Sequence, residues 1–207
     1  AAPEHAAADD VVAVSGTAWL AVAKASAAGT VVLRAQDLEA YGDAQDKTLI
    51  LVADAPLRRT LELFAPEEDI PPQGIHASAV IDPSATLGKG VCIGPFVQVG
   101  PGASLGEGVV LESGAQVGAR GKIGARSRLR RHAILGRDCV LGEDGTLHEH
   151  AVVGGEGFGF DYAPGQAAHR LPHLGAVCIG HRFELGVQSC VDRGLLTNTT
   201  IGHDVKI

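Results

Sequence analysis

An aliphatic residue at every sixth position is the feature that most restricts the folds open to this chain. A period of six matches neither the 3.6-residue turn of an α-helix nor a heptad. The residue two positions earlier is usually small or apolar. Because side chains alternate along a strand, both residues of each unit should face one interior. The series covers fourteen positions without exception: Ile75, Ile81, Leu87, Ile93, Val99, Leu105, Leu111, Val117, Ile123, Leu129, Leu135, Leu141, Leu147 and Val153.

A glycine follows many of these aliphatic residues, and we expect it to give the backbone the freedom that a tight corner requires. Each unit of six then forms one short strand and one corner. Three units close a triangular coil of 18 residues, and stacked coils pair their strands in parallel. The sequence therefore predicts a parallel β-helix shaped as a triangular prism, with all fourteen aliphatic side chains inside.

Residues 1–70 lack the sixfold repeat and predict a small α/β domain. Residues 71–207 predict the β-helix, with insertions at 154–176 and 192–199 where the repeat loses its phase. We expect these insertions to carry the function, because the coils of a solenoid mainly build a scaffold. Strands are expected at 11–14, 31–33 and 49–52, helices at 18–28 and 56–64, and a stiff linker at 66–74.

Composition excludes several classes of protein. A formal net charge of −7 disfavours a general nucleic-acid binder, which needs a basic surface. No apolar run is long enough to span a bilayer, so no integral membrane segment is expected. Four cysteines without a Cys-x-x-Cys spacing predict free thiols in a reducing compartment, and no secretory signal precedes the first strand. We therefore expect a cytoplasmic protein.

One stretch of the chain is strongly basic, with no acidic residue between positions 120 and 137. On an acidic protein, such a belt suits an acidic partner or a nucleotide diphosphate, although charge runs are more often solvated faces. Its members are Arg120, Lys122, Arg126, Arg128, Arg130, Arg131 and Arg137.

Three histidines gather near the end of the uninterrupted repeat. His132 and His150 differ by 18 positions and should stack on adjacent coils, about 4.8 Å apart. His148 is expected on the same side of the chain as His150. The cluster suits a substrate contact, a polar ladder or an exposed solvated face. Zinc bound by neutral imidazoles is a further reading, as in gamma-class carbonic anhydrases, which use the same solenoid.

Three motifs in a fixed order carry a family resemblance: residues 152–160 (Val-Val-Gly-Gly-Glu-Gly-Phe-Gly-Phe), 171–175 (Leu-Pro-His-Leu-Gly) and 191–194 (Val-Asp-Arg-Gly). With the repeat, they resemble the UDP-3-O-acylglucosamine N-acyltransferases of lipid A biosynthesis. The resemblance implies a left-handed β-helix and a homotrimer without a metal or tightly bound cofactor. It implies transfer of a 3-hydroxyacyl chain from acyl carrier protein to the 2-amino group of UDP-3-O-acylglucosamine.

Several residues are candidates for substrate binding. Phe158 and Phe160 can line a cleft for an acyl chain or sugar face, with Gly157 and Gly159 allowing close approach. Alternatively, this loop plugs against a neighbouring subunit. His148 occupies a position where relatives also carry a histidine. Asp192 and Arg193 can orient partner groups or form an ion pair that pins the second insertion.

The sequence departs from the family pattern at the general base and at the uridine site. The family's base is a histidine in an Ile-Ala-His-Asn stretch, expected beyond Ile207, so we expect a chain truncated at both ends. His203 is a weak candidate within the chain. The family's N-terminal domain binds uridine, but its Asn-Pro-Tyr-like signature is replaced by Asp54-Ala-Pro-Leu57. Another amino-sugar acyltransferase, a metalloenzyme like the gamma-class carbonic anhydrases, and a non-catalytic solenoid remain as alternatives.

Overall fold

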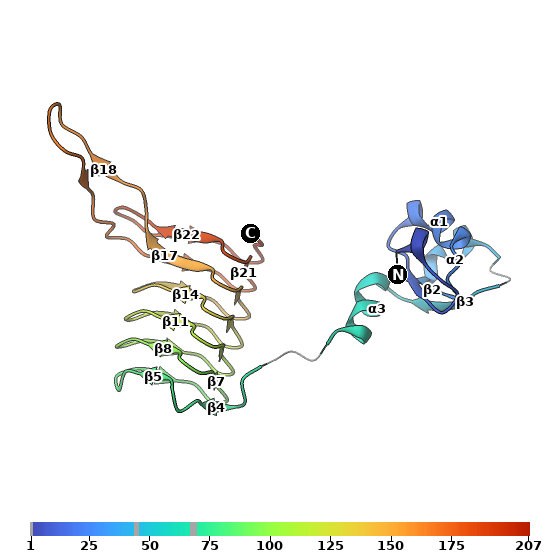
Figure 1. Ribbon diagram of the computed structural model, residues 1–207, viewed down its shortest axis with the longest axis horizontal. Helices are drawn as coiled ribbons and strands as arrows, with labels where there is room; N and C mark the ends of the chain where they lie inside the picture. The colour runs from blue at the N-terminus through green and yellow to red at the C-terminus, as the bar shows by residue number, and fades with distance from the viewer. Residues whose placement is uncertain (1, 44–45, 67–69) are drawn as a thin grey trace. The chain divides into compact units, whose positions relative to one another are not determined.

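The computed structural model describes residues 2–43, 46–66 and 70–207. The chain divides into two compact units, Ala1–Glu68 and Asp69–Ile207 (Figure 1). In the described residues, no helix is long and apolar enough to cross a membrane.

The first unit is a three-stranded parallel sheet with short helices. Strands β1 (Val11–Ala13), β2 (Thr30–Arg34) and β3 (Thr48–Val52) pair in the order β1-β2-β3. Its core includes Val12, Val31, Leu33 and Tyr41. The helices are η1 (Pro3–His5), η2 (Thr17–Trp19), α1 (Leu20–Ala25), η3 (Ala35–Asp37), α2 (Leu38–Tyr41) and α3 (Pro56–Phe64).

The predicted strands and helix 56–64 are confirmed, whereas the helix expected over 18–28 is shorter. The chain there forms a 3-10 turn and then α1, which ends at Ala25. The hydroxyl of Ser26 donates to the Ala23 carbonyl, and Ser26 itself is extended, so the helix cannot continue. Helix α2 has only four residues, too few to leave a periodic pattern in the sequence.

The second unit is a left-handed parallel β-helix, which confirms the predicted fold class. It has three six-stranded parallel sheets: β21-β16-β13-β10-β7-β4, β22-β17-β14-β11-β8-β5 and β23-β20-β15-β12-β9-β6. Leu111 pairs with Leu129, and Leu129 with Leu147, which is the expected step of one coil. The strands before the insertion are β4 (Gly74–Ile75), β5 (Val80–Ile81), β6 (Thr86–Leu87), β7 (Cys92–Ile93), β8 (Gln98–Val99), β9 (Ser104–Leu105), β10 (Val110–Leu111), β11 (Gln116–Val117), β12 (Lys122–Ile123), β13 (Arg128–Leu129), β14 (Ile134–Leu135), β15 (Val140–Leu141) and β16 (Thr146–Leu147).

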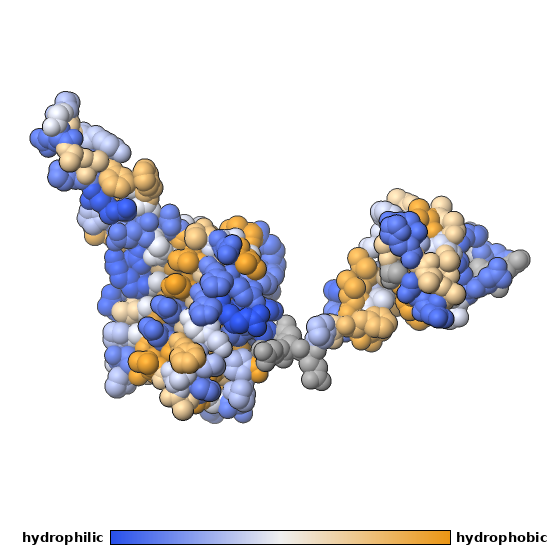
Figure 2. Space-filling view, viewed as in Figure 1, coloured by the Kyte–Doolittle hydropathy of each residue, from blue (hydrophilic) through white to orange (hydrophobic). Residues whose placement is uncertain are grey.

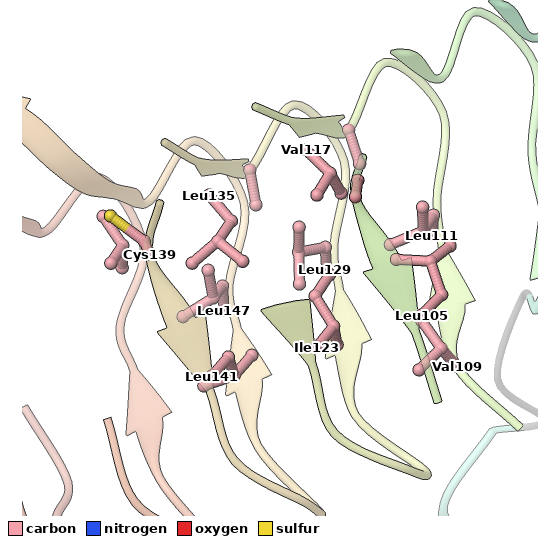
Figure 3. Close-up of a cluster of buried hydrophobic side chains, with 14 of the residues drawn as sticks. Leu105, Val109, Leu111, Val117, Ile123, Leu129, Leu135, Cys139, Leu141 and Leu147 are labelled. Atoms are coloured by element: carbon pink, nitrogen blue, oxygen red, sulfur yellow. The ribbon is translucent and has the colours of Figure 1, made fainter. Parts of the chain in front are cut away.

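The aliphatic series forms the core of the prism, as Figure 3 shows for its middle coils. The eleven members from Ile93 to Val153 are at most 3% exposed. The expectation that all fourteen lie inside is wrong at the first coil, where Ile75 is 54% exposed. Its strand β4 lies at the edge of its sheet, where β7 is its only neighbour among the described strands. Ile81 and Leu87 are therefore only partly buried.

Except at Gly154, where φ is 88°, the glycines that follow the aliphatic residues serve a different purpose from the one predicted. The left-handed backbone lies two positions later, at Gly102 (φ 65°) and also at non-glycine residues such as Arg120 (φ 56°). At Gly118, by contrast, an added Cβ would lie 2.5 Å from the backbone nitrogen of Arg137 on the next coil. At Gly124 it would lie 2.5 Å from the nitrogen of Glu143. These glycines let successive coils approach each other, so the need is for space rather than for backbone freedom.

At Gly154 the chain leaves the coils and forms an arm, which we define as residues 154–175. Strand β17 (Val152–Glu156) runs outward, and β18 (Phe160–Asp161) and β19 (His169–Arg170) pair as an antiparallel hairpin. Figure 1 shows the hairpin projecting beyond the stacked coils. The coil resumes at β20 (Val177–Ile179), followed by β21 (Glu184–Leu185), β22 (Cys190–Arg193) and β23 (Thr199–Ile201).

Candidate functional site

The base of the arm is supported by the second stretch where the repeat loses its phase. Strand β22 extends beside β17, pairing Gly155 with Asp192 and Glu156 with Arg193. The carboxylate of Asp192 is exposed, and its main-chain carbonyl accepts a hydrogen bond from the hydroxyl of Thr199. The two insertions are thus parts of one structure. They carry Asp192 beside the beginning of the Gly-Phe-Gly-Phe loop.

Two phenylalanines and an arginine form an aromatic cluster on the arm. Phe158 is 88% exposed, and its ring meets that of Phe160 edge-on at 4.9 Å. The guanidinium of Arg170 lies 4.9 Å from the centre of the Phe160 ring, a cation–π contact. Phe160 is thereby fixed within the arm, whereas Phe158 offers its ring to a ligand or another protein surface.

The sequence reasoning left one arm residue without a role. His173 is only 7% exposed, and its Nδ1 lies 3.1 Å from the Leu171 carbonyl, to which it must donate. A Cβ on Gly157 would lie 2.7 Å from Nε2 of His173, and one on Gly159 would lie 3.0 Å from Cε1. In this structure the group that approaches both glycines is therefore His173. The signal was the motif at 171–175, in which this histidine falls.

Arg193 makes no ion pair with Asp192 in the described part of the chain. Its guanidinium is buried and donates to three main-chain carbonyls, those of Gly154, Gly175 and Arg137. The ion pair considered as one role for this dipeptide is thus replaced by main-chain contacts. Arg193 points into the base of the arm, whereas the side chain of Asp192 remains at the surface.

His148 lies at a different corner of the prism, directly after β16. Its Nε2 lies 2.7 Å from Oε1 of Glu184, to which it donates, and Lys206 Nζ lies 3.4 Å from Oε2. The hydrogen bond from His148 is the main reason that the pKa of Glu184 is lowered. Lys206 adds to that shift, and burial opposes it. When neutral, His148 keeps its other nitrogen, Nδ1, as an acceptor for a substrate proton or polar group.

The arm and His148 are not brought together within one chain. His148 precedes β17, and the Gly-Phe-Gly-Phe loop follows it, so the length of this strand separates them. The chain thus presents two separate candidate surfaces: the arm with Asp192, and the corner around His148 and Glu184.

Four other histidines form two stacked pairs. The rings of His132 and His150 lie 5.1 Å apart and nearly parallel, which confirms the expected stack. In the described residues, no three His, Cys, Asp or Glu side chains are grouped so that they could hold a metal ion.

His203 stacks on His181 at 4.9 Å, and its Nδ1 accepts a hydrogen bond from the His181 backbone N–H. Neutral His203 therefore carries its proton on Nε2 and has no free lone pair on the ring. It is a poor general base in this geometry.

The basic stretch is not an isolated belt, which corrects that interpretation of the sequence. Neighbouring coils supply acids that the stretch itself lacks. Because residues one coil apart lie side by side, these acids form ion pairs with the basic residues and neutralise much of the stretch. The ion pairs are Arg120–Asp138, Arg126–Asp144, Arg128–Glu112 and Arg131–Glu149.

The first unit carries an apolar groove of about 560 Å³. Trp19, Leu57 and Leu61 line it and are 50%, 46% and 59% exposed. Figure 2 shows the apolar surface of this unit, to which Leu63 and Phe64 of α3 also contribute. Leu57 belongs to the Asp54-Ala-Pro-Leu57 stretch, and Asp54 accepts a hydrogen bond from Arg59.

Comparison with known proteins agrees with this architecture. The family model described as bacterial transferase hexapeptide (six repeats) matches residues 84–119. Among solved structures, WeeI from Acinetobacter baumannii AYE is 13% identical with a TM-score of 0.51, covering 95% of this chain and 96% of that one. At this identity, the likeness supports the fold alone.

Curated relatives extend the comparison to both units. A UDP-3-O-acylglucosamine N-acyltransferase of Xanthomonas euvesicatoria pv. vesicatoria is 59% identical over 182 residues, 87% of this chain and 52% of the relative. One from Leptospira biflexa is 46% identical over 200 residues, 95% of this chain and 55% of the relative. The chain thus spans about half the length of these relatives. Because the identity covers most of this chain, both of its units are similar to the UDP-3-O-acylglucosamine N-acyltransferases.

Proposed function

We propose that this protein transfers a 3-hydroxyacyl chain from acyl carrier protein to the 2-amino group of UDP-3-O-acylglucosamine, a cytoplasmic step of lipid A biosynthesis. The observation that carries the proposal is the 59% identity to a protein of that name over 87% of the chain. So wide a match cannot be confined to the repeat, because the β-helical unit is only residues 69–207.

The reaction forms an amide N–C bond and breaks the thioester C–S bond of the carrier. The attacking amine must lose a proton, and the leaving thiolate must gain one, so one base can serve both steps. We assign that base to the histidine that the resemblance places beyond Ile207, because His203 uses its Nδ1 lone pair on the backbone. His148 binds a polar group of the substrate through Nδ1, while Glu184 fixes its ring.

The arm provides the apolar part of the proposed substrate site. Phe158 contacts the acyl chain or sugar face, and Asp192 binds a polar group beside it. In the proposed homotrimer, a neighbouring copy brings the arm and a His148 corner into one cleft. The separation of these two surfaces within one chain supports this assignment, since an inter-subunit site needs residues from different corners.

The groove of the first unit is the proposed uridine site, although the family's tyrosine is replaced by Leu57. Trp19 is half exposed on the wall of this groove and supplies a ring on which a base can stack. It is the single tryptophan of the chain, so its fluorescence reports on this groove alone. UDP should quench that emission in a saturable way, and Leu61→Glu should weaken the binding. Unchanged emission at saturating UDP would place the uridine elsewhere.

The decisive assay uses 3-hydroxyacyl carrier protein and UDP-3-O-acylglucosamine, with mass spectrometry of the product. It should be run with residues 1–207 alone and with whatever the reading frame encodes beyond Ile207. We expect an N-acylated product with the longer chain and little or none with residues 1–207. Acyl transfer only to another amino sugar would contradict the proposed substrate. Stoichiometric zinc with carbon dioxide hydration, or binding without turnover by the longer chain, would contradict the proposed reaction.

A further inference from the structure

Arg193 is the buried charged residue at the point where the arm joins the coils. It is 4% exposed, and its guanidinium is used in three directions. Nε donates to the carbonyl of Gly154 at 2.9 Å, Nη1 to that of Gly175 at 3.3 Å, and Nη2 to that of Arg137 at 2.9 Å. Each nitrogen of the planar group therefore holds a different segment of the chain.

The three acceptors mark three places in the fold. Gly154 is where the chain leaves the coils, Gly175 is where it returns, and Arg137 belongs to the coil before the arm. Arg193 itself lies on β22, beside Glu156. One side chain thus joins both ends of the arm to the prism and to the strand that carries Asp192.

Contacts near Arg193 also constrain the backbone at both ends of the arm. Gly154 has a φ of 88°, and a Cβ at this position would collide with the sulfur of buried Cys139. At the returning end, the Asn198 side chain accepts a hydrogen bond from the Ala176 N–H. The exit and the return are therefore fixed where they meet the coils. All ten residues from 161 to 170, in contrast, are exposed, and Figure 2 shows a mainly hydrophilic outer end.

The three main-chain carbonyls explain why an arginine occupies position 193. Main-chain carbonyls that point at one centre from three sides require a planar donor with several N–H groups in fixed directions. A lysine would keep the charge but could not reach all three carbonyls from one nitrogen in the same geometry. Without the guanidinium, these three carbonyls would lose this donor at a buried or partly buried position, which is unfavourable.

We infer that Arg193 is a positioning residue that holds the arm, and with it Phe158 and Asp192, in the orientation that the acceptor substrate needs. The assignment of a substrate role to the arm rests on the proposed function. The structural part does not: without the guanidinium, the arm should lose its fixed orientation while the coils stay folded. Arg193 acts through the arm and need not touch the substrate.

The first test measures the arm itself and needs no substrate. Amide hydrogen exchange is compared between the wild-type protein and Arg193→Lys, with Arg120→Lys as the matched control. Arg120 also makes a bidentate contact, to Asp138, but it lies on an exposed corner. We expect exchange in residues 154–160 and 171–175 to rise at least about tenfold in Arg193→Lys, with no change over 91–147. Unchanged exchange in the arm would overturn the inference, as would faster exchange throughout the coils.

The second test asks whether the held orientation serves the reaction. In Arg193→Lys we expect the KM for the UDP-linked acceptor to rise about tenfold, with kcat changed less than about threefold. In Arg193→Ala the KM should rise by a similar factor. Guanidinium ion at tens of millimolar should then lower the KM of Arg193→Ala part of the way back and slow amide exchange in its arm. A fall in kcat alone, or no rescue of either quantity, would contradict a positioning role. These kinetics use the longer chain of the decisive assay, and absence of product from that chain would defeat the proposed function while leaving the exchange result intact.

Discussion

The coils from Val91 to Val153 and the arm from Gly154 to Gly175 are held in place by different forces. In the coils, each unit of six residues adds two inward residues to a continuous core, and the aliphatic series from Ile93 on is at most 3% exposed. In the arm, His173 is the only large buried side chain, and its attachment depends on hydrogen bonds at the base. A two-stranded hairpin is marginally stable by itself, so these bonds decide where it lies.

This difference between coils and arm suggests that the coils determine stability and the arm determines substrate binding. Core burial is spread over many equivalent coils, so the scaffold has no single weak point. Few packed side chains hold the arm, so its local opening requires little free energy, and many of its groups are exposed. Both properties are typical of segments that bind and release ligands. A change in the coils should therefore alter stability, and a change in the arm should alter substrate affinity.

Loss of a core side chain in the middle of the prism should have the largest effect. Leu129 is fully buried between Leu111 and Leu147 on the neighbouring coils. Leu129→Ala should lower the free energy of unfolding by about 2–5 kcal/mol, because it leaves a cavity that the stacked coils cannot close. Denaturant titration measures this, with exposed Gln116→Ala as the control. Equal midpoints for the two variants would show that the stack does not depend on its inward stripe.

A pair of glycine substitutions distinguishes space from backbone freedom. Gly118→Ala places a methyl group 2.5 Å from the Arg137 nitrogen, so the coils must separate locally, at a cost of about 1–3 kcal/mol. Gly102→Ala meets only the flexible Arg120 side chain, at 3.3 Å, but must adopt φ 65°. Arg120 takes that conformation on the next coil, so we expect about 1 kcal/mol. Thermal unfolding compares the two, and a larger loss at Gly102 would restore the original interpretation.

Acid should weaken the last coils through Glu184. Its pKa is lowered in the folded state by the hydrogen bond from His148, so the unfolded chain binds more protons at low pH. This contribution to stability is complete above the unfolded value of about 4.3 and is lost as the pH falls through the lower folded pKa. Glu184→Gln should flatten the decline in stability below about pH 4.5, whereas exposed Glu107→Gln should not. If the free energy of unfolding fell with pH in the same way in both variants, the His148–Glu184 contact would not contribute to stability.

Phe158→Ala should have the smallest effect on stability, within about 0.5 kcal/mol, because the ring is 88% exposed. Under the proposed function, the same change should raise the KM for an acylated substrate about tenfold, a loss of about 1.4 kcal/mol in binding. Steady-state kinetics and a melting curve on the same preparation test both halves. A destabilised protein with unchanged KM would mean that Phe158 packs against the molecule rather than the substrate.

The sequence predicted the coils well because their pattern is local and repeated. Every unit of six residues has two inward positions, and both follow the same period. A step of 18 residues is then enough to predict that His132 stacks on His150. The exposed Ile75 was missed because a repeat does not show where the stack ends. The reason predicted for the glycines after the aliphatic residues was wrong at positions such as Gly118, where the crowding comes from Arg137 on another coil.

The candidate site was harder to predict because its contacts join residues without a fixed spacing. The Gly-Phe-Gly-Phe and Asp-Arg-Gly motifs identified where the chain departs from the coil. They did not reveal that Arg193 bonds to Gly154 and Gly175, or that His173 fills the space over Gly157 and Gly159. The basic stretch was misjudged for the same reason, because its acids, such as Glu112 and Asp138, lie on adjacent coils.

Amide hydrogen exchange of the protein with and without UDP-3-O-acylglucosamine asks whether the arm, rather than the coils, binds the acceptor. We expect the ligand to slow exchange at the base of the arm, over residues 154–160 and 171–175, and to leave exchange over residues 91–147 unchanged. Slower exchange confined to the coils, with the arm unaffected at saturating ligand, would contradict this expectation.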